Sequence, residues 1–90
     1  MPRYIIEVTH ENSKLECARA IEIFLSSGSH FLTNADWGCP DDVHKAWFFM
    51  DAIDKNEAIM IVPPALRKDT RIIELAKFSM KDVDKMMNKH

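Results

Sequence analysis

The sequence lacks the features that direct a protein to a nucleic acid, a nucleotide or a membrane. Its 12 Lys and Arg residues alternate with 14 Asp and Glu residues instead of forming the basic cluster that binds phosphates. It has no glycine-rich phosphate loop, which argues against a nucleotide cofactor. Its apolar runs are far shorter than the roughly 18 residues that cross a bilayer. We therefore expect no cofactor, no nucleic-acid partner and no membrane partner.

Cysteine is also scarce, since Cys17 and Cys39 are the only two in the chain. We expect no signal peptide before them, because Glu7 follows Met1 too early for an apolar core segment. We therefore expect a cytoplasmic protein whose thiols are reduced, with no disulfide. The 90 residues, 47% of them hydrophobic, fit a single domain over residues 1–90 with a modest core.

The apolar pattern and the helix caps predict the element order β-α-β-β-α-β-α. A first helix follows the S-x-x-E capping box of Ser13 and Glu16, and Gly28 can end it in the left-handed conformation. Asp54 opens a short second helix, and Ser79 caps the last one. Runs rich in β-branched and aromatic residues predict the four strands, which are residues 3–9, 30–37, 43–52 and 70–78.

This order predicts an α+β fold. Its first six elements follow the split βαβ, or ferredoxin-like, order, and right-handed crossovers place both helices on one face of a four-stranded antiparallel sheet. The strands are apolar on both faces, as at Ile5–Ile6 and Ile72–Ile73, so the second face needs a cover. A partner sheet in a symmetric homodimer is the simplest cover. The alternative is that the C-terminal helix folds back over the sheet.

The element order, the two-sided strands and the strand with Trp47-Phe48-Phe49 resemble the dimeric α+β barrel superfamily of ferredoxin-like proteins. That superfamily includes muconolactone isomerase-like and antibiotic-biosynthesis monooxygenase-like proteins. The resemblance covers residues 3–78 and the terminal helix. It implies dimers that pack sheet to sheet and, commonly, a small-molecule pocket beside the sheet. It carries over no catalytic residue, because members of the superfamily differ widely in their chemistry.

Side chains that could carry chemistry gather between His30 and Trp47. His30, Asn34 and Asp36 share one face of the predicted strand, because strand side chains alternate with a period of two. If the hairpin register pairs Asp36 with His44, the carboxylate orients an imidazole for proton transfer, and His30, Asp36 and His44 are the candidate catalytic residues. A register slipped by one residue sends His44 to the other face. The alternative is a solvated hairpin end with turn-forming acidic residues.

The same stretch offers walls for a ligand pocket. Trp37 and Trp47 could line a site for a flat or apolar molecule, with Asn34 and Cys39 as further contacts. Packing in the core or in a dimer interface is the alternative, because a buried aromatic side chain contributes a large apolar area.

A metal site is not predicted. Cys39 and His44 stand in C-x4-H spacing, but a closed zinc site needs four ligands, usually in paired short spacings. The other histidines are too scattered along the sequence to form a second pair: His10, His30 and His90.

The sequence therefore favours a cytoplasmic homodimer that binds a small organic molecule. The resemblance implies cofactor-free chemistry of the isomerase or monooxygenase kind. The alternative is a non-catalytic dimerisation or regulatory module without a ligand site.

Overall fold

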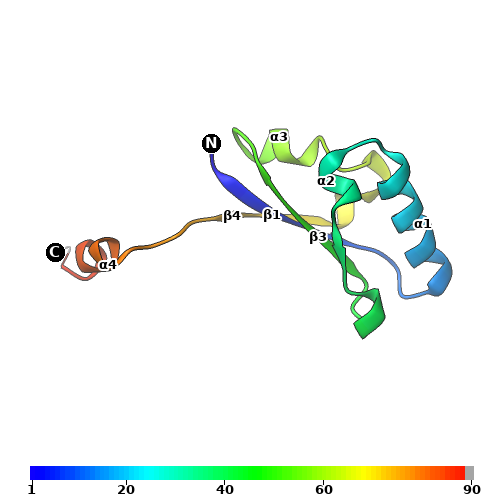
Figure 1. The fold of residues 1–90 in the computed structure, drawn as a ribbon, viewed down its shortest axis with the longest axis horizontal. Coiled ribbons are helices and arrows are strands. Elements are labelled where there is room, and N and C mark those ends of the chain that lie inside the picture. The colour runs from blue at the N-terminus through cyan, green and yellow to red at the C-terminus, as the bar shows by residue number, and fades with distance from the viewer. Residues whose placement is uncertain (89–90) are drawn as a thin grey trace.

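Strand β1 (Arg3–Thr9) lies at the centre of a mixed α+β fold in the computed structural model, which describes residues 1–88 (Figure 1). It pairs antiparallel with β3 (Lys45–Asp51) on one side and with β4 (Thr70–Leu75) on the other. The short β2 (Asp36–Trp37) pairs with the outer side of β3, which gives the strand order β2-β3-β1-β4. All three pairings are antiparallel, as the sequence predicts.

The predicted helix starts are confirmed. The side chains of Ser13 and Asp54 accept hydrogen bonds from backbone N–H groups three residues on, and Ser79 forms a reciprocal capping box with Asp82. Gly28 has a φ of 77°, the left-handed conformation expected after the first helix. The helical elements are α1 (Lys14–Ser26), α2 (His30–Thr33), η1 (Cys39–Asp41), α3 (Lys55–Ile59), η2 (Pro64–Asp69) and α4 (Met80–Met87).

The predicted strand over residues 30–37 is wrong for its first half. Ser29 caps a turn of helix there by accepting the Leu32 N–H at 3.3 Å. The Thr33 hydroxyl donates to the Ser29 carbonyl at 2.9 Å, and the Asn34 side chain donates to the His30 carbonyl at 2.8 Å. These local bonds favour the helical turn over a strand. The other predicted strands are confirmed with shorter ends, since β3 covers 45–51 of 43–52 and β4 covers 70–75 of 70–78.

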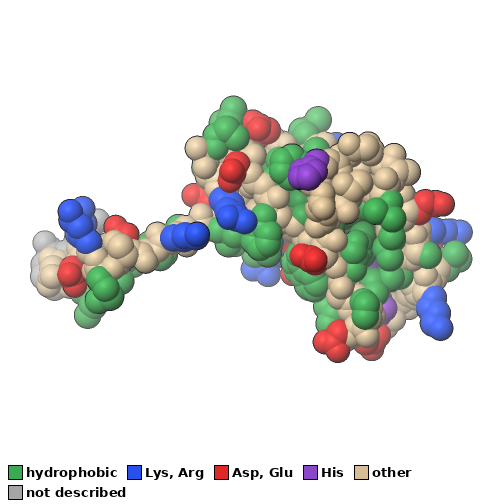
Figure 2. Space-filling view, viewed as in Figure 1, with side chains coloured by type: hydrophobic (Ala, Val, Ile, Leu, Met, Phe, Trp, Pro, Cys, Tyr) green, Lys and Arg blue, Asp and Glu red, His purple; other side chains and the backbone are tan. Residues whose placement is uncertain are grey.

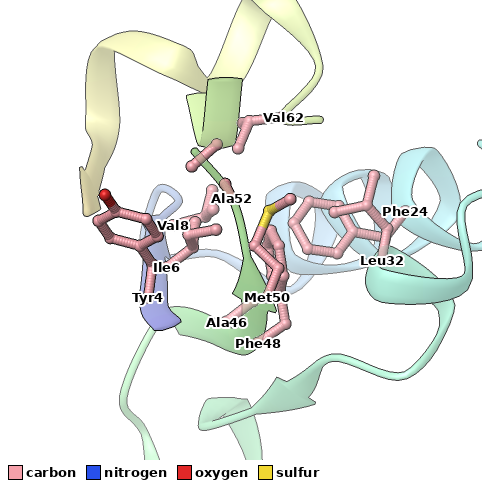
Figure 3. Close-up of a cluster of buried hydrophobic side chains, with 11 residues drawn as sticks. Tyr4, Ile6, Val8, Phe24, Leu32, Ala46, Phe48, Met50, Ala52 and Val62 are labelled. Atoms are coloured by element: carbon pink, nitrogen blue, oxygen red, sulfur yellow. The ribbon is translucent and has the colours of Figure 1, made fainter. Parts of the chain in front are cut away.

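The core lies between one face of the sheet and the helices. Phe24 of α1 and Leu32 of α2 are almost completely buried, and Figure 3 shows them opposite the sheet side chains. The ring of Phe24 contacts those of Trp37 and Phe48 edge to face, with centroids 4.9 and 6.3 Å apart. The sheet contributes every second residue of its two central strands: Tyr4, Ile6, Val8, Ala46, Phe48 and Met50.

The opposite side of the sheet, here called the open face, remains half exposed. The ladder registers place its apolar side chains together, and Glu7 lies beside them on β1, where its carboxylate accepts from the Trp47 indole N–H at 3.1 Å. That hydrogen bond, together with one that Lys45 Nζ donates to Glu7 Oε2 at 3.4 Å, lowers the pKa of Glu7 below its ordinary value. The apolar members of the open face are Ile5, Trp47, Phe49, Ile73 and Leu75.

Helix α4 does not fold back over the open face. Residues 76–79 leave β4 as an extended arm and carry α4 away from the rest of the chain (Figure 1). The structure therefore measures 53 × 27 × 21 Å along its principal axes.

We expect the core to depend on Phe24, which is 0% exposed. Phe24→Ala should cost roughly 3–5 kcal/mol in the free energy of unfolding, measured with a chemical denaturant, because it leaves a cavity against the sheet. Leu25→Ala, at the next position of α1 and 58% exposed, is the matched control. It should cost no more than about 1 kcal/mol. Equal costs for the two variants would contradict the core described here.

Candidate functional site

The register between β2 and β3 separates the predicted catalytic residues. Asp36 pairs with Trp47, and Trp37 pairs with Ala46, so Asp36 does not stand opposite His44. The pairing on which the proton-transfer hypothesis depended is therefore not the register of this hairpin. His44 instead has its Nε2 atom 3.0 Å from Asp42 Oδ1.

His30 and Asn34 belong to a different local environment. Both are exposed at α2, where the His30 Nδ1 atom lies 3.3 Å from the Asn34 side-chain nitrogen. Their hydrogen bonds within the described chain stay inside this helical turn. The structure does not join them to Asp36 or His44.

The two tryptophans lie on opposite faces of the sheet. Trp37 faces the helices, where its ring contacts Phe24, while Trp47 faces the open side and donates to Glu7. They do not form the two walls of one pocket. The structure therefore favours the alternative interpretation of Trp37 as a packing residue.

The fourth predicted ligand contact, Cys39, lies in a cluster that the sequence did not indicate. Its Sγ atom forms a disulfide with Cys17 and lies 3.3 Å from His10 Nε2. His10, Cys39 and His44 each offer one atom that can bind a metal ion, and these three atoms lie within 4.8 Å of one another. We call these four residues, His10, Cys17, Cys39 and His44, the Cys-His cluster. The expectation of no disulfide is wrong, because the fold brings together two cysteines that are 22 positions apart.

The β1–β3 ladder places both histidines. Thr9 pairs with Lys45, and beyond this last pair the His10 N–H donates to the His44 carbonyl at 3.0 Å. Because side chains alternate along a strand, His10 continues the core-facing series of Val8, and His44 continues that of Ala46. The two rings meet edge to face with centroids 5.5 Å apart.

Helix α1 places Cys17. The Ser13 cap starts the helix at Lys14, so Cys17 lies in its first full turn. Cys17, Ala20 and Phe24 follow a spacing of i, i+3 and i+7, which is one stripe of a helix, and the latter two are buried against the sheet. Cys17 therefore faces the end of β1.

The turn between β2 and β3 places Cys39. A side chain at Gly38 would meet the Val43 carbonyl oxygen at 2.6 Å, so only glycine fits this tight approach. Asp42 closes the turn in the left-handed conformation, with a φ of 58°. The same residue supplies the carboxylate that contacts His44.

The imidazoles of the cluster are unusually short of partners. The Nδ1 atoms of His10 and His44 are buried and have no hydrogen-bond partner within residues 1–88. Burial, and secondarily the neighbouring His44, lowers the pKa of His10 below its ordinary value of 6.5, against a smaller opposite effect of Glu16. His10 is therefore neutral at pH 7 and able to offer a lone pair.

Sequence reasoning missed His10 and Cys17 as members of the site. The available signal was the spacing of H-x6-C at 10–17 beside C-x4-H at 39–44. Neither spacing has meaning by itself, because only the antiparallel pairing of β1 and β3 brings the two segments together. His90 lies outside the described residues.

Comparisons with known proteins add no family to this description. No protein-family model matches the chain, and no curated protein or solved structure matches it either. Within residues 1–88, none of the helices combines the length and apolar character that a membrane crossing needs.

We expect the metal-free protein to lose stability as the pH falls below about 6.5, the ordinary pKa of the imidazole. The sign follows because the pKa of His10 is lower in the folded state than in the unfolded state. The unfolded chain then binds more protons in this window, so unfolding becomes more favourable with acid. Denaturant unfolding at pH 7.5 and at about pH 5.5 measures the effect. His10→Gln should show a weaker pH dependence, whereas His30→Gln, at an exposed site, should behave like the wild type. Identical profiles for the wild type and His10→Gln would contradict this account.

Proposed function

We propose that the reduced protein binds a zinc ion through the Cys-His cluster, and that the ion stabilises the fold. The observation that carries the proposal is the meeting of His10, Cys39 and His44, whose donor atoms lie within 4.8 Å of one another, while Cys17, bonded to Cys39, brings a second sulfur to the same place. Two thiolates and two imidazoles form a donor set that zinc binds in a closed, tetrahedral geometry.

The distances support this donor set. In tetrahedral zinc sites a bound sulfur and a bound nitrogen lie about 3.6 Å apart, given bonds of about 2.3 and 2.05 Å. The separation of Cys39 Sγ and His10 Nε2 is 3.3 Å. The Cα atoms of Cys17 and Cys39 are 7.1 Å apart. That span is wider than the roughly 4.4–6.8 Å usual for a disulfide, and it suits two sulfurs that share an ion.

Asp42 supports His44 as a ligand. Its carboxylate holds the Nε2–H side of the ring, which leaves Nδ1 as the atom with the free lone pair. Histidines that bind metals commonly donate their other ring N–H to a carboxylate, which orients the ring and raises its basicity. The lowered pKa of His10 favours the neutral form that a ligand needs.

Metal binding in this proposal depends on the redox state of the cysteines. A dithiol reductant supplies two electrons and two protons to the Cys17–Cys39 bond, yielding two thiols and the oxidised reductant. Zinc then displaces the thiol protons. A cytoplasmic location, where thiols are kept reduced, would favour the metal-bound form.

The proposed role is structural. Four protein ligands leave zinc without the open position that catalytic sites keep for water or substrate. The ion would tie α1 and the β2–β3 turn to the paired ends of β1 and β3. A chain of 90 residues has a small core, and such domains commonly gain stability from a metal or a cross-link.

We expect zinc to raise the melting temperature of the reduced protein. At free zinc 1,000-fold above its Kd the gain is about 4 kcal/mol, which is roughly 15 °C or more for a domain of this size. Cobalt used in place of zinc should give the charge-transfer absorption of a thiolate–cobalt bond.

Cys17→Ser and His10→Gln should reduce both signals, while His30→Gln should retain them. Oxidised protein should not respond to zinc. Reduced protein with no zinc-dependent rise and no thiolate–cobalt band would exclude the site.

A second proposal is a homodimer of ferredoxin-like domains that binds a small organic molecule. The antiparallel order β2-β3-β1-β4, with α1 and α3 contributing to the core on the same face, supports the ferredoxin-like interpretation. The half-exposed apolar open face supports a dimer. A hollow of about 540 Å³ at the end of this face, lined by Arg3, Phe49 and Leu75 among others, has the volume of small-molecule sites. Isomerase or monooxygenase-like chemistry would need groups other than the separated His30, Asp36 and His44.

We expect native mass spectrometry of the gently purified, untagged protein to find a dimer with retained small-molecule mass. The extra mass should vanish on denaturation. A dimer without extra mass would instead favour the non-catalytic dimerisation module. A monomer at concentrations of tens of micromolar would remove this second proposal and leave the metal site untouched.

A further inference from the structure

Helix α4 is an amphipathic helix with nothing packed on its apolar side. None of its eight side chains, all within the described chain, is buried, and Met80 and Met87 are more than 70% exposed. Figure 2 shows hydrophobic side chains on the surface of this isolated end of the molecule. An eight-residue helix is too short to be stable alone in water, even with the capping box of Ser79 and Asp82. Its stability therefore requires a packing partner.

The exposed area of the chain is larger than that of a compact monomer. A folded monomer of 10.4 kDa exposes about 5,400 Å², whereas this chain exposes 6592 Å². The excess is about 1,200 Å², more than the roughly 800 Å² that each partner contributes to a standard protein–protein interface. The radius of gyration of 16.1 Å likewise exceeds the about 12 Å expected of a compact chain of this length.

The open face is an apolar surface, like the unpacked side of α4. Its apolar side chains lie between two pairs of opposite charge, Arg3 opposite Asp51 at one end and Arg71 opposite Glu7 at the other. On α4 the helical period gathers Met80, Val83, Met86 and Met87 on one side, with Asp82 and Asp84 at its flanks and Lys81 and Lys85 behind it. The match between α4 and the face is therefore one of apolar surface against apolar surface, since the ends of the face carry charges of both signs.

The arm favours a partner chain over its own sheet. Residues 76–79 are Ala-Lys-Phe-Ser and run away from the sheet in extended form (Figure 1). A return over the chain's own open face needs a sharp reversal; this segment contains no Gly, Pro, Asn or Asp, and its one turn-forming residue, Ser79, caps α4. An outward arm can instead reach a second molecule without any reversal.

We propose that two chains exchange their arms, so that α4 of each packs its apolar stripe of Met80, Val83, Met86 and Met87 on the open face of the other. Each chain gives one helix and receives one, so the assembly closes as a symmetric dimer. The inference rests on the homodimer proposed above and names the segment that forms it.

Complementation between two variants tests the exchange. Val83→Asp places a charge in the apolar stripe of the arm, and Phe49→Asp places one on the open face, at a position that is 46% exposed. Each variant alone should dimerise only at roughly 100-fold higher protein concentration than the wild type. Mixed in equal amounts they should form a heterodimer, because the intact arm of the Phe49→Asp chain finds the intact face of the Val83→Asp chain. Native mass spectrometry distinguishes the three species if one chain carries ¹⁵N.

The controls distinguish arm exchange from dimerisation by another route and from a monomer. Lys81→Asp places the same side chain on the opposite side of α4 and should leave the dimer intact. Circular dichroism melts check that both variants fold, and Phe49→Ser replaces Phe49→Asp if the latter does not. A dimer that survives Val83→Asp would overturn the exchange and leave the homodimer proposal standing. A monomeric wild type would overturn both. Two folded monomeric variants that do not complement each other would also overturn the exchange.

Discussion

The pairing of β1 with β3 on one edge and β4 on the other is the constraint on which the rest of the structure depends. Because both edges of β1 are paired, its side chains can only alternate between the two faces of the sheet. Tyr4, Ile6 and Val8 enter the core, and Ile5 joins the open face. The same ladder runs on to His10 at the edge of the helix layer. One set of backbone hydrogen bonds thus orders the core, the open face and the Cys-His cluster.

Because the core occupies only one face of a small sheet, it leaves one end of the sheet and the open face weakly stabilised. At one end of the sheet, the first turn of α1 and the β2–β3 turn come together beside the ends of β1 and β3. There Cys17 and Cys39 meet, as a disulfide in this structure and as proposed ligands when reduced. On the other side of the sheet, the open face and α4 both expose apolar surface to water, which is unfavourable. Cross-linking and association are the usual ways in which short chains compensate for a limited core.

The polar and aromatic residues that gather between His30 and Trp47 in the sequence are separated in space. His30 belongs to a capped helical turn, Asp36 to an edge strand, and the two tryptophans to opposite faces. The Cys-His cluster instead combines residues from positions 10 to 44 that have no common motif. Local density of polar residues was therefore a poor guide here, because a hairpin spreads neighbouring residues over two faces and two strands.

The sequence by itself determined the local features whose causes are local. The caps at Ser13, Asp54 and Ser79 set where helices begin, because each side chain bonds a backbone N–H three residues on. The β-branched run of β1 and the aromatic run of β3 likewise predicted strands and an antiparallel α+β fold. The strand predicted over 30–37 was wrong for its first half, because a short apolar run has no reliable period and the Ser29 cap favours a helical turn over residues 30–33. Only the tertiary structure decided the β2–β3 register, the meeting of His10 with Cys39, and the outward course of α4. These depend on contacts between distant segments, whose free energy no single stretch of sequence contains.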